Sequence, residues 1–321
     1  MSKSYLRYSS IQRPFGIIVS QGSNIVTNDK RHLCVCGASQ SVAIWNLNTE
    51  ERSVFETTSS SEVTRVQSKG NMVCAGFADG RLVVWDIETK KIIFEGKGHK
   101  HAITALTHGD ESVIASGGKD TDIVIWDTIR GAGEFRLRGH NDEVTDLVFF
   151  AKSNSENKYL ASSSKDTLFK VWCMETQCCV QTCVGHRSEV WSIAKHPSMP
   201  YLMTASSDRF VRMWKIQEEE TVSDKNEHLK LVGTLQRQAG GRSSEIRFNE
   251  TGTHLACQSN SKGTDLWYMR SEKDARKKGK RRERRGREKD RKKEARKKDA
   301  DDDKSEKKIE VLGGEDDEFS S

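Results

Sequence analysis

A tryptophan that recurs about every 40 residues is the feature that most constrains how this chain folds. The six tryptophans of the series are separated by 40, 41, 46, 42 and 53 residues, and each ends a short apolar run. They are Trp45, Trp85, Trp126, Trp172, Trp214 and Trp267. A period of this length indicates a repeat architecture, in which each unit is one small supersecondary structure that buries its apolar surface against its neighbours.

The segments between these tryptophans have the pattern of short strands. In the third unit, Ile103–Leu106, Ser112–Ser116 and Asp122–Trp126 are runs of strand length, and Gly117–Asp120 supplies a turn between the last two. The chain has only 3 prolines, as expected where most backbone N–H groups donate to strand ladders. The histidine of a Gly-His pair precedes three of the tryptophans by 27 to 32 residues. This pattern of Gly-His pairs and recurrent tryptophans resembles the WD-repeat family. The resemblance implies an all-β fold, a β-propeller with four strands in each blade.

Three units repeat a set of four polar side chains at nearly constant spacing. In each set the aspartate precedes the tryptophan by six residues and follows a serine or threonine by four. The sets are His99, Ser116, Asp120 and Trp126; His140, Ser162, Asp166 and Trp172; and His186, Thr204, Asp208 and Trp214. In a WD blade such residues form a hydrogen-bonded chain from carboxylate to imidazole to hydroxyl to indole, and we expect three structural tetrads here.

Serine, histidine and aspartate in one set also compose a catalytic triad, so a hydrolase is an alternative interpretation. A catalytic triad occurs once, at a cleft with an oxyanion hole, whereas this set recurs at the same place in three units. We therefore expect no catalytic residue and no enzyme. No glycine-rich phosphate-binding loop or catalytic pair of carboxylates is recognisable, and we expect no cofactor and no small-molecule substrate.

Half of the 8 cysteines fall within one unit. They are Cys173, Cys178, Cys179 and Cys183. Their spacing differs from that of zinc knuckles and ribbons, so we predict buried or edge thiols and no metal site. Residues 1–15 contain no apolar h-region, so we expect no secretory signal and reduced cysteines in the cytosol or nucleus. No run approaches the roughly 18 apolar residues that a membrane span needs, and we expect no membrane association.

We place the propeller at residues 15–270, after an N-terminal arm at residues 1–14. Six blades are recognisable, which describes either a six-bladed ring or a seven-bladed ring that lacks one blade. The second unit has Ala75 where the hydroxyl belongs, and the first and sixth units keep only the tryptophan. We expect Phe15–Val19 and Ser23–Thr27 to supply an extra strand that closes the ring.

Charge is divided unevenly along the chain. Residues 1–270 carry a net charge of +2, residues 271–298 carry +11, and residues 299–321 carry −7. The basic low-complexity segment has no aromatic or branched apolar side chain to bury in a core. We therefore expect a disordered or partly helical tail, with any helix broken near Gly279 and Gly286.

The basic segment has three interpretations: a solvated flexible insert, a nuclear or nucleolar localisation signal, or an electrostatic contact with RNA phosphates. The candidate residues for the last two are Lys277, Lys278, Lys280, Arg281, Arg282, Arg284, Arg285 and Arg287. No aromatic residue is interleaved with them, which argues against stacking on single-stranded bases. The acidic tail at residues 299–321 could fold back on the basic segment and weaken its affinity for RNA.

Several short segments resemble one WD-repeat family more specifically. They are Ser4–Tyr8, Phe15–Ile18, Ser116–Asp127 (SGGKDTDIVIWD) and Gly185–Trp191 (GHRSEVW), and a basic insert directly follows the sixth unit. Together they are similar to the N-terminal part of the WD-repeat protein 3 family, over about residues 4–298. The resemblance implies a UTP-B subunit of the small-subunit processome, a nucleolar scaffold that associates with small nucleolar RNA. Family members are longer and hold two propellers, so we expect a fragment without a seventh blade and a second propeller.

The resemblance implies a non-catalytic scaffold in small-subunit (18S) ribosomal RNA processing and ribosome biogenesis, located in the nucleus and nucleolus. Its partners would be other processome WD-repeat proteins and, directly or indirectly, small nucleolar RNA and pre-ribosomal RNA. Loop residues would carry the contacts, because the blade interiors are used for packing. The candidates, which are otherwise ordinary solvated turn residues, are Lys100, Lys119, Lys165, Arg187 and Arg209. The alternative is an adaptor in a chromatin or ubiquitin-ligase complex that recognises a peptide or histone in the central channel. It would need an aromatic and acidic cluster at the channel mouth, and Tyr and Phe are sparse at the predicted loops.

Overall fold

The structure, a computed structural model, divides the chain into two units. It describes residues 19–20, 22–28, 32–49, 51–57, 60–109, 112–152, 158–217, 228–261, 263–270, 274, 276–289 and 291. The first unit ends at Trp267 and the second begins at Tyr268, close to the predicted end of the propeller at residue 270. The other predicted boundaries, and the acidic tail, lie outside the described residues.

The described residues form six antiparallel sheets, each built from strands that are consecutive in the chain. The first three sheets are β1 (Ile25–Asn28), β2 (Leu33–Ala38), β3 (Ser41–Asn46) and β4 (Arg52–Phe55); β5 (Val63–Lys69), β6 (Met72–Phe77), β7 (Arg81–Asp86) and β8 (Ile92–Lys97); and β9 (Ile103–His108), β10 (Val113–Gly118), β11 (Ile123–Asp127) and β12 (Ala132–Leu137). The last three are β13 (Val144–Ala151), β14 (Lys158–Ser164), β15 (Phe169–Cys173) and β16 (Cys178–Cys183); β17 (Val190–Lys195), β18 (Tyr201–Ser206), β19 (Phe210–Ile216) and β20 (Leu229–Gln236); and β21 (Ser243–Phe248), β22 (His254–Ser259) and β23 (Thr264–Tyr268).

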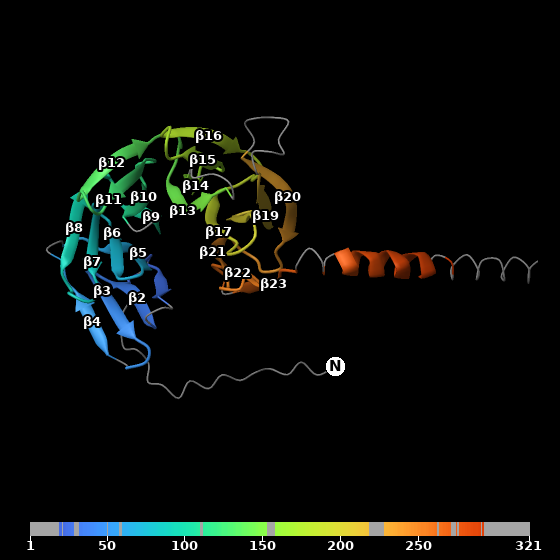
Figure 1. Ribbon diagram of the computed structural model, residues 1–321, viewed down its shortest axis with the longest axis horizontal. Coiled ribbons are helices and arrows are strands. Elements are labelled where there is room, and N and C mark those ends of the chain that lie inside the picture. Colours follow the sequence, from blue (N-terminus) through green and yellow to red (C-terminus); the bar gives the residue numbers. More distant parts are fainter. Residues whose placement is uncertain are drawn as a thin grey trace, which may run out of the picture. The chain divides into compact units, whose positions relative to one another are not determined.

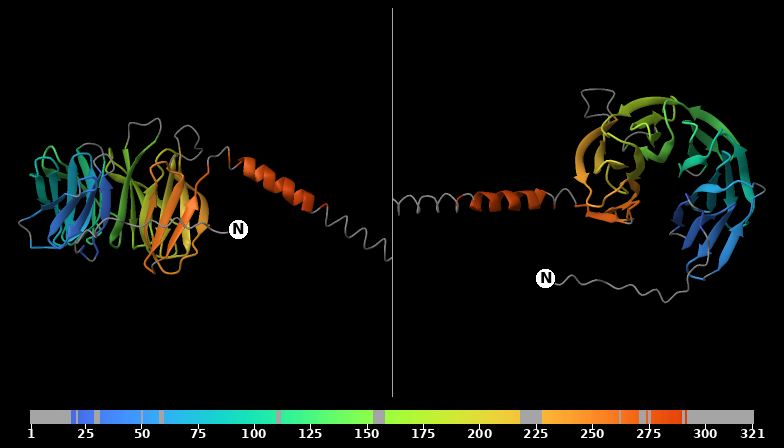
Figure 2. Two further views of the ribbon diagram at one scale, coloured as in Figure 1. Left: turned by 90° about the horizontal axis from the view of Figure 1, so that it is seen from below. Right: turned by 180° about the vertical axis from the view of Figure 1, so that it is seen from behind.

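These sheets are the blades of a β-propeller, which confirms the predicted fold class. The first strand of each blade lies nearest the ring axis, and the fourth strand lies on the rim (Figure 1). In side view the strands run from one face of the ring to the other (Figure 2). Each blade contacts the next mainly through these inner strands, in the order β5, β9, β13, β17 and β21.

The described sheets form an open arc, with a gap between the first and sixth blades (Figure 1). The prediction that Ser23–Thr27 supplies an extra strand to close the ring is wrong. Residues 25–28 instead form β1, the inner strand of the first blade, paired with β2. Of Phe15–Val19, only Val19 is described, and it is not in a strand. Residues 25–28 take this place because β2 pairs with β3 on one edge and needs a strand to pair with on its other edge.

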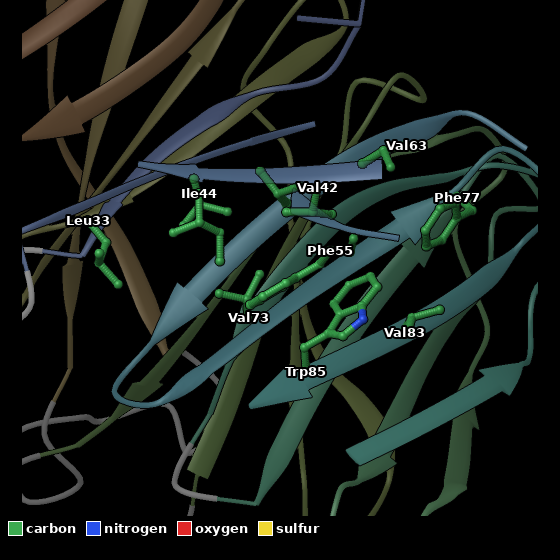
Figure 3. Close-up of a cluster of buried hydrophobic side chains, with 12 residues drawn as sticks. Leu33, Val42, Ile44, Phe55, Val63, Val73, Phe77, Val83 and Trp85 are labelled. Carbon is green, nitrogen blue, oxygen red and sulfur yellow. The ribbon is translucent and has the colours of Figure 1, made fainter. Parts of the chain in front are cut away.

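The hydrophobic core is divided into clusters that are each shared by two consecutive blades. Between the first and second blades, the Phe55 and Trp85 rings stack with their centroids 6.0 Å apart (Figure 3). Between the second and third, Phe94 packs on Trp126 at 5.5 Å, and between the fourth and fifth Phe169 packs on Trp214 at 5.7 Å. The recurrent tryptophan therefore attaches a blade to the one before it, which explains why its period defines the repeat.

A threonine at a β-bulge adds a polar link between blades. The pairing of the inner strand with its neighbour is interrupted after its first residue, at Thr64, Thr104 and Thr145. Each hydroxyl donates to the carbonyl of the first inner-strand residue of the following blade, at 2.6 Å from Thr64 to Ile103 for example. These bonds satisfy buried backbone carbonyls and fix the angle between adjacent blades.

The second unit contains a helix. Residues 274, 276–289 and 291 are helical where the structure describes them. The helix is continuous through Gly279 and Gly286, so the predicted break near these glycines is wrong. Lysine, arginine and glutamate, which are good helix formers, surround both glycines and offset their cost of about 1 kcal/mol each. No helix among the described residues is long and apolar enough to span a membrane.

Candidate functional site

The tetrad of the third blade is a continuous chain of hydrogen bonds. The Nδ1 of His99 lies 2.9 Å from Oδ1 of Asp120, and its Nε2 lies 2.8 Å from Oγ of Ser116. The indole N–H of Trp126 donates to the same Oγ at 2.7 Å. A proton on Nδ1 gives every atom a role: the imidazole donates to the carboxylate, the hydroxyl donates to Nε2, and the indole donates to the hydroxyl oxygen.

The fourth blade repeats this geometry, with 2.8 Å from His140 to Asp166, 2.7 Å from His140 to Ser162 and 2.8 Å from Trp172 to Ser162. Backbone N–H groups of Asn141 and Leu168 also donate to Asp166. Burial alone would raise the pKa of this carboxyl, but the bonds from His140 and the backbone lower it to about 2. The aspartate therefore stays ionised and holds the turn between β14 and β15 against the loop before β13.

The fifth blade contains an additional cation. The bonds from His186 and Trp214 to Thr204 are 2.7 and 2.9 Å, but the distance from His186 to Asp208 is 3.3 Å. Arg212 donates to Asp208 at 2.8 Å and also contacts His186. Burial lowers the pKa of His186, and the neighbouring Arg212 guanidinium lowers it further against the effect of Asp208.

The hydroxyls of the three tetrads are buried, as the predicted structural role requires. Ser116, Ser162 and Thr204 are all 0% exposed, each enclosed between an imidazole and an indole. A nucleophile needs a cleft in which a substrate carbonyl can approach it, and these three positions have none. In the second blade, where Ala75 replaces the hydroxyl, Asp79 pairs with Arg81 at 2.7 Å instead.

The predicted partner-binding residues do not form one site. Lys119 lies at a hollow of about 450 Å³ at the end of the ring axis where the inner strands begin. Lys165 reaches toward the same hollow, donating to Glu143 at 2.6 Å and lying over the Trp191 ring at 5.0 Å. The remaining candidates are exposed turn residues that do not line the hollow: Lys100, Arg187 and Arg209.

Two residues of this hollow, Trp191 and Arg242, are missing from the sequence-based candidates. Trp191 is the bulge residue of β17, and the Arg242 guanidinium lies 4.0 Å from the centre of its ring. The available signal was the alignment of the repeats, since EVT at Glu62 and at Glu143 becomes EVW at Glu189. The residues that gather here are aromatic and basic, whereas the adaptor alternative would need an aromatic and acidic cluster.

The predicted RNA-binding or localisation residues all lie on the helix of the second unit. Every one of them is exposed. They are Lys277, Lys278, Lys280, Arg281, Arg282, Arg284, Arg285 and Arg287. At 3.6 residues per turn these cations cover about 220° of the helix circumference. The remaining face holds Gly279, Glu283 and Gly286, so the described helix has no face of large apolar side chains.

The clustered cysteines are at the edge of the fourth blade. Cys173 at the end of β15 pairs in register with Cys178 at the start of β16, and both are free thiols. Cys173 and Cys183 are buried, whereas Cys178 and Cys179 are exposed. Among the residues that the structure describes, no three His, Cys, Asp or Glu side chains are placed to hold a metal ion.

Comparison with curated proteins gives WD-repeat relatives with diverse roles. Nuclear distribution protein PAC1 of Arthroderma otae is 28% identical over 152 residues, which cover 45% of this chain and 33% of the relative. Anaphase-promoting complex subunit cdh1 of Dictyostelium discoideum is 31% identical over 46% of this chain and 20% of the relative. Pre-mRNA-processing factor 19 of Caenorhabditis elegans is 26% identical over 49% of this chain and 32% of the relative. The aligned segments thus span a fifth to a third of these relatives.

Among solved structures, the computationally designed Ika8 protein superimposes with a TM-score of 0.62 over 77% of this chain and 70% of its own, at 24% identity. This likeness supports the fold alone. Residues 32–216, more than half of the chain, match the WDR3 first beta-propeller domain. The chain therefore belongs to the WDR3 family and contains sequence of its first β-propeller, as the sequence resemblance predicted.

Proposed function

We propose that the chain is a non-catalytic scaffold in small-subunit ribosomal RNA processing, working in the nucleolus with other WD-repeat proteins of the processome. The observation that carries this proposal is the match of residues 32–216 to the WDR3 first beta-propeller domain. A propeller presents two faces and a rim on a rigid frame, so it holds several partners in fixed relation to one another. The buried tetrads make the frame rigid and leave the loops for contacts.

The basic helix supports a contact with RNA within this role. Residues 276–289 hold ten lysines and arginines and two glutamates. Like charges one turn apart, such as Lys277 and Arg281, repel each other and destabilise the isolated helix. RNA phosphates would relieve that repulsion and release counterions, without reading any base. The helix is thus suited to sequence-independent binding of pre-ribosomal or small nucleolar RNA.

Co-purification tests the scaffold role. The full chain, tagged and expressed in cells, should recover processome WD-repeat proteins and small nucleolar RNA. Trp172→Ala, which removes a buried anchor of the fourth blade, is the matched control and should recover neither. Recovery of chromatin or ubiquitin-ligase subunits in place of processome subunits would contradict the proposal and favour the adaptor.

Salt dependence tests the helix separately. A helix variant with Arg281, Arg284, Arg285 and Arg287 changed to Gln should bind single-stranded RNA more weakly. The slope of log K against log salt should fall in magnitude by about 0.7 for each lost phosphate contact. A matched variant changes the exposed propeller residues Lys90, Lys91, Lys97 and Arg138 to Gln and should keep the wild-type slope. An equal slope for wild type and the helix variant would exclude the helix as an RNA contact.

A further inference from the structure

One position of the repeat changes its chemistry in a single blade. The second residue of the inner strand is a bulge residue that lines the axial hollow in five consecutive blades. It has a small hydroxyl side chain in four of them and a large aromatic ring in the fifth. The residues are Thr64, Thr104, Thr145, Trp191 and Ser244. Three of the hydroxyls donate to a backbone carbonyl of the following blade. Trp191 has no hydroxyl and therefore cannot make this hydrogen bond.

A second position changes in the adjacent blade. The residue just before the inner strand accepts a backbone hydrogen bond from the turn between the second and third strands, in five blades. In order along the chain, these acceptors are Glu62, Ala102, Glu143, Glu189 and Arg242. The sixth blade thus has a positive charge where three blades have a negative one. The backbone bond does not require this change, because a carbonyl oxygen of any residue serves as acceptor.

The two exceptional side chains meet. The Arg242 guanidinium carbon lies 4.0 Å above the Trp191 ring, and Lys165 Nζ lies over the ring at 5.0 Å. The Trp191 indole N–H donates to Ser207 at 2.8 Å, which fixes the orientation of the ring. The repeat pattern is thus broken at two positions whose side chains are in contact. Such exceptions to a folding pattern concentrate at functional sites.

The hollow around this pair has an excess of positive charge. Arg65, Lys119 and Arg242 line it, and among the described residues no carboxylate forms an ion pair with any of the three. Its one lining acid, Glu143, is neutralised by Lys165 at 2.6 Å. Arg242 is exposed although its guanidinium carbon lies 4.0 Å from the centre of the Trp191 ring, so its N–H groups are available for bidentate binding of a carboxylate.

We infer that this axial hollow binds an acidic, extended peptide segment of a protein partner, with Arg242 on Trp191 as its central anchor and Arg65 and Lys119 as flanking cations. Its volume of about 450 Å³ fits a few side chains rather than a folded domain. A nucleic acid is less favoured, because Arg242 and Lys165 already lie over the Trp191 ring on which a base would stack. The inference gives the scaffold a peptide-binding site and holds whether or not the assembly is ribosomal.

Fluorescence anisotropy with the full chain tests it, using a short labelled peptide in which Glu alternates with Gly. Trp191→Thr introduces the residue that the second, third and fourth blades have at this position. Arg242→Glu introduces the residue that the second, fourth and fifth blades have at the other position. Neither change should therefore disturb the fold. Each should raise the Kd at least about tenfold. Arg187→Glu makes an equivalent charge change on an exposed residue outside the hollow and should stay within about twofold of wild type. A Gln-Gly peptide should not bind.

The charge of the basic helix would also attract acidic peptides, so the comparison is repeated in the helix variant defined above, where the same rise in Kd should appear. Unchanged affinity in Trp191→Thr and Arg242→Glu, or no measurable binding to the wild-type chain, would overturn the inference. The inference would also be overturned if Trp191→Thr and Arg242→Glu weakened binding of a labelled uridine oligonucleotide but left peptide binding unchanged. If Trp191→Thr lowers the thermal midpoint, Arg242→Glu and Lys119→Glu, both at exposed residues, decide the matter.

Discussion

The fourth and sixth blades come from the same repeat but bury their strands differently. In the fourth blade every residue of β14 after Lys158 is buried, and Trp172 is 1% exposed. In the sixth blade only alternate residues of β22 are buried, and Leu266 of β23 is 67% exposed. The fourth blade has a blade on each side, whereas the described sixth blade packs on the fifth alone. A blade therefore buries its apolar side chains fully only when a neighbouring blade packs on each of its two faces.

Replacing the recurrent tryptophan should show the largest difference between the two blades. Trp172→Ala should lower the free energy of unfolding by about 3–5 kcal/mol, because it leaves a cavity between the third and fourth blades. Trp267→Ala, at a half-buried residue, should cost about 1 kcal/mol. Urea unfolding followed by circular dichroism measures both. Equal losses would show that the terminal blade is as well packed as the interior one.

Acidification should weaken the interior contact between the second and third blades. His108 is buried with its Nε2 3.2 Å from the Cys74 thiol, and desolvation, aided by Lys69, lowers its pKa to about 4. The folded protein favours the neutral imidazole of His108, so the contribution of this residue to the free energy of unfolding is complete above pH 6.5 and falls as the pH drops toward 4. By about pH 4 the free energy of unfolding should have fallen by about 3 kcal/mol.

The variant His108→Gln should flatten this part of the stability profile, although burial of His99 and His186 lowers their pKa values and leaves a smaller decline of the same sign. His254→Gln, at an exposed residue of the sixth blade, is the matched control. A profile equally steep in His108→Gln and wild type would contradict the assignment.

Removing one tetrad hydroxyl should have an intermediate effect. Ser162→Ala leaves the buried His140 Nε2 and the Trp172 indole N–H without their partner, which should cost about 2 kcal/mol. The reciprocal change Ala75→Ser, in a blade with no tetrad histidine, should give no gain. Thermal unfolding of both variants measures the difference, and a stabilised Ala75→Ser would show that the hydroxyl acts without the imidazole.

The bulge hydroxyl should show the smallest difference. Thr145→Val loses a 2.6 Å bond to the Val190 carbonyl of the following blade and should cost about 1 kcal/mol. Ser244→Ala changes the same position in the sixth blade, where the hydroxyl is exposed, and should cost close to nothing. Urea midpoints measured side by side test this pair. A larger cost for Ser244→Ala would indicate that a further element covers the sixth blade.

The sequence predicted the tetrads residue by residue, because their spacing reflects the length of a strand pair and its turn. The Trp191–Arg242 pair was not predicted, since its residues are 51 positions apart in the chain and meet only when β17 and β21 of adjacent blades pack together. The low helix propensity of glycine predicts a break at Gly279 and Gly286, but the lysines, arginines and glutamates around both residues sustain the helix. The place of β1 could not be predicted, because a strand that opens the first blade and a strand that closes the last blade have the same sequence pattern.

The bulge threonines of the second, third and fourth blades all donate toward the C-terminal neighbour, so the links between blades are short and sequential. An array with only nearest-neighbour links loses its units from an end. When force is applied at its termini, this protein should therefore unfold one blade at a time from an end rather than in a single step. Each blade of about 40 residues would release roughly 13–14 nm of chain, a step length that an optical trap resolves.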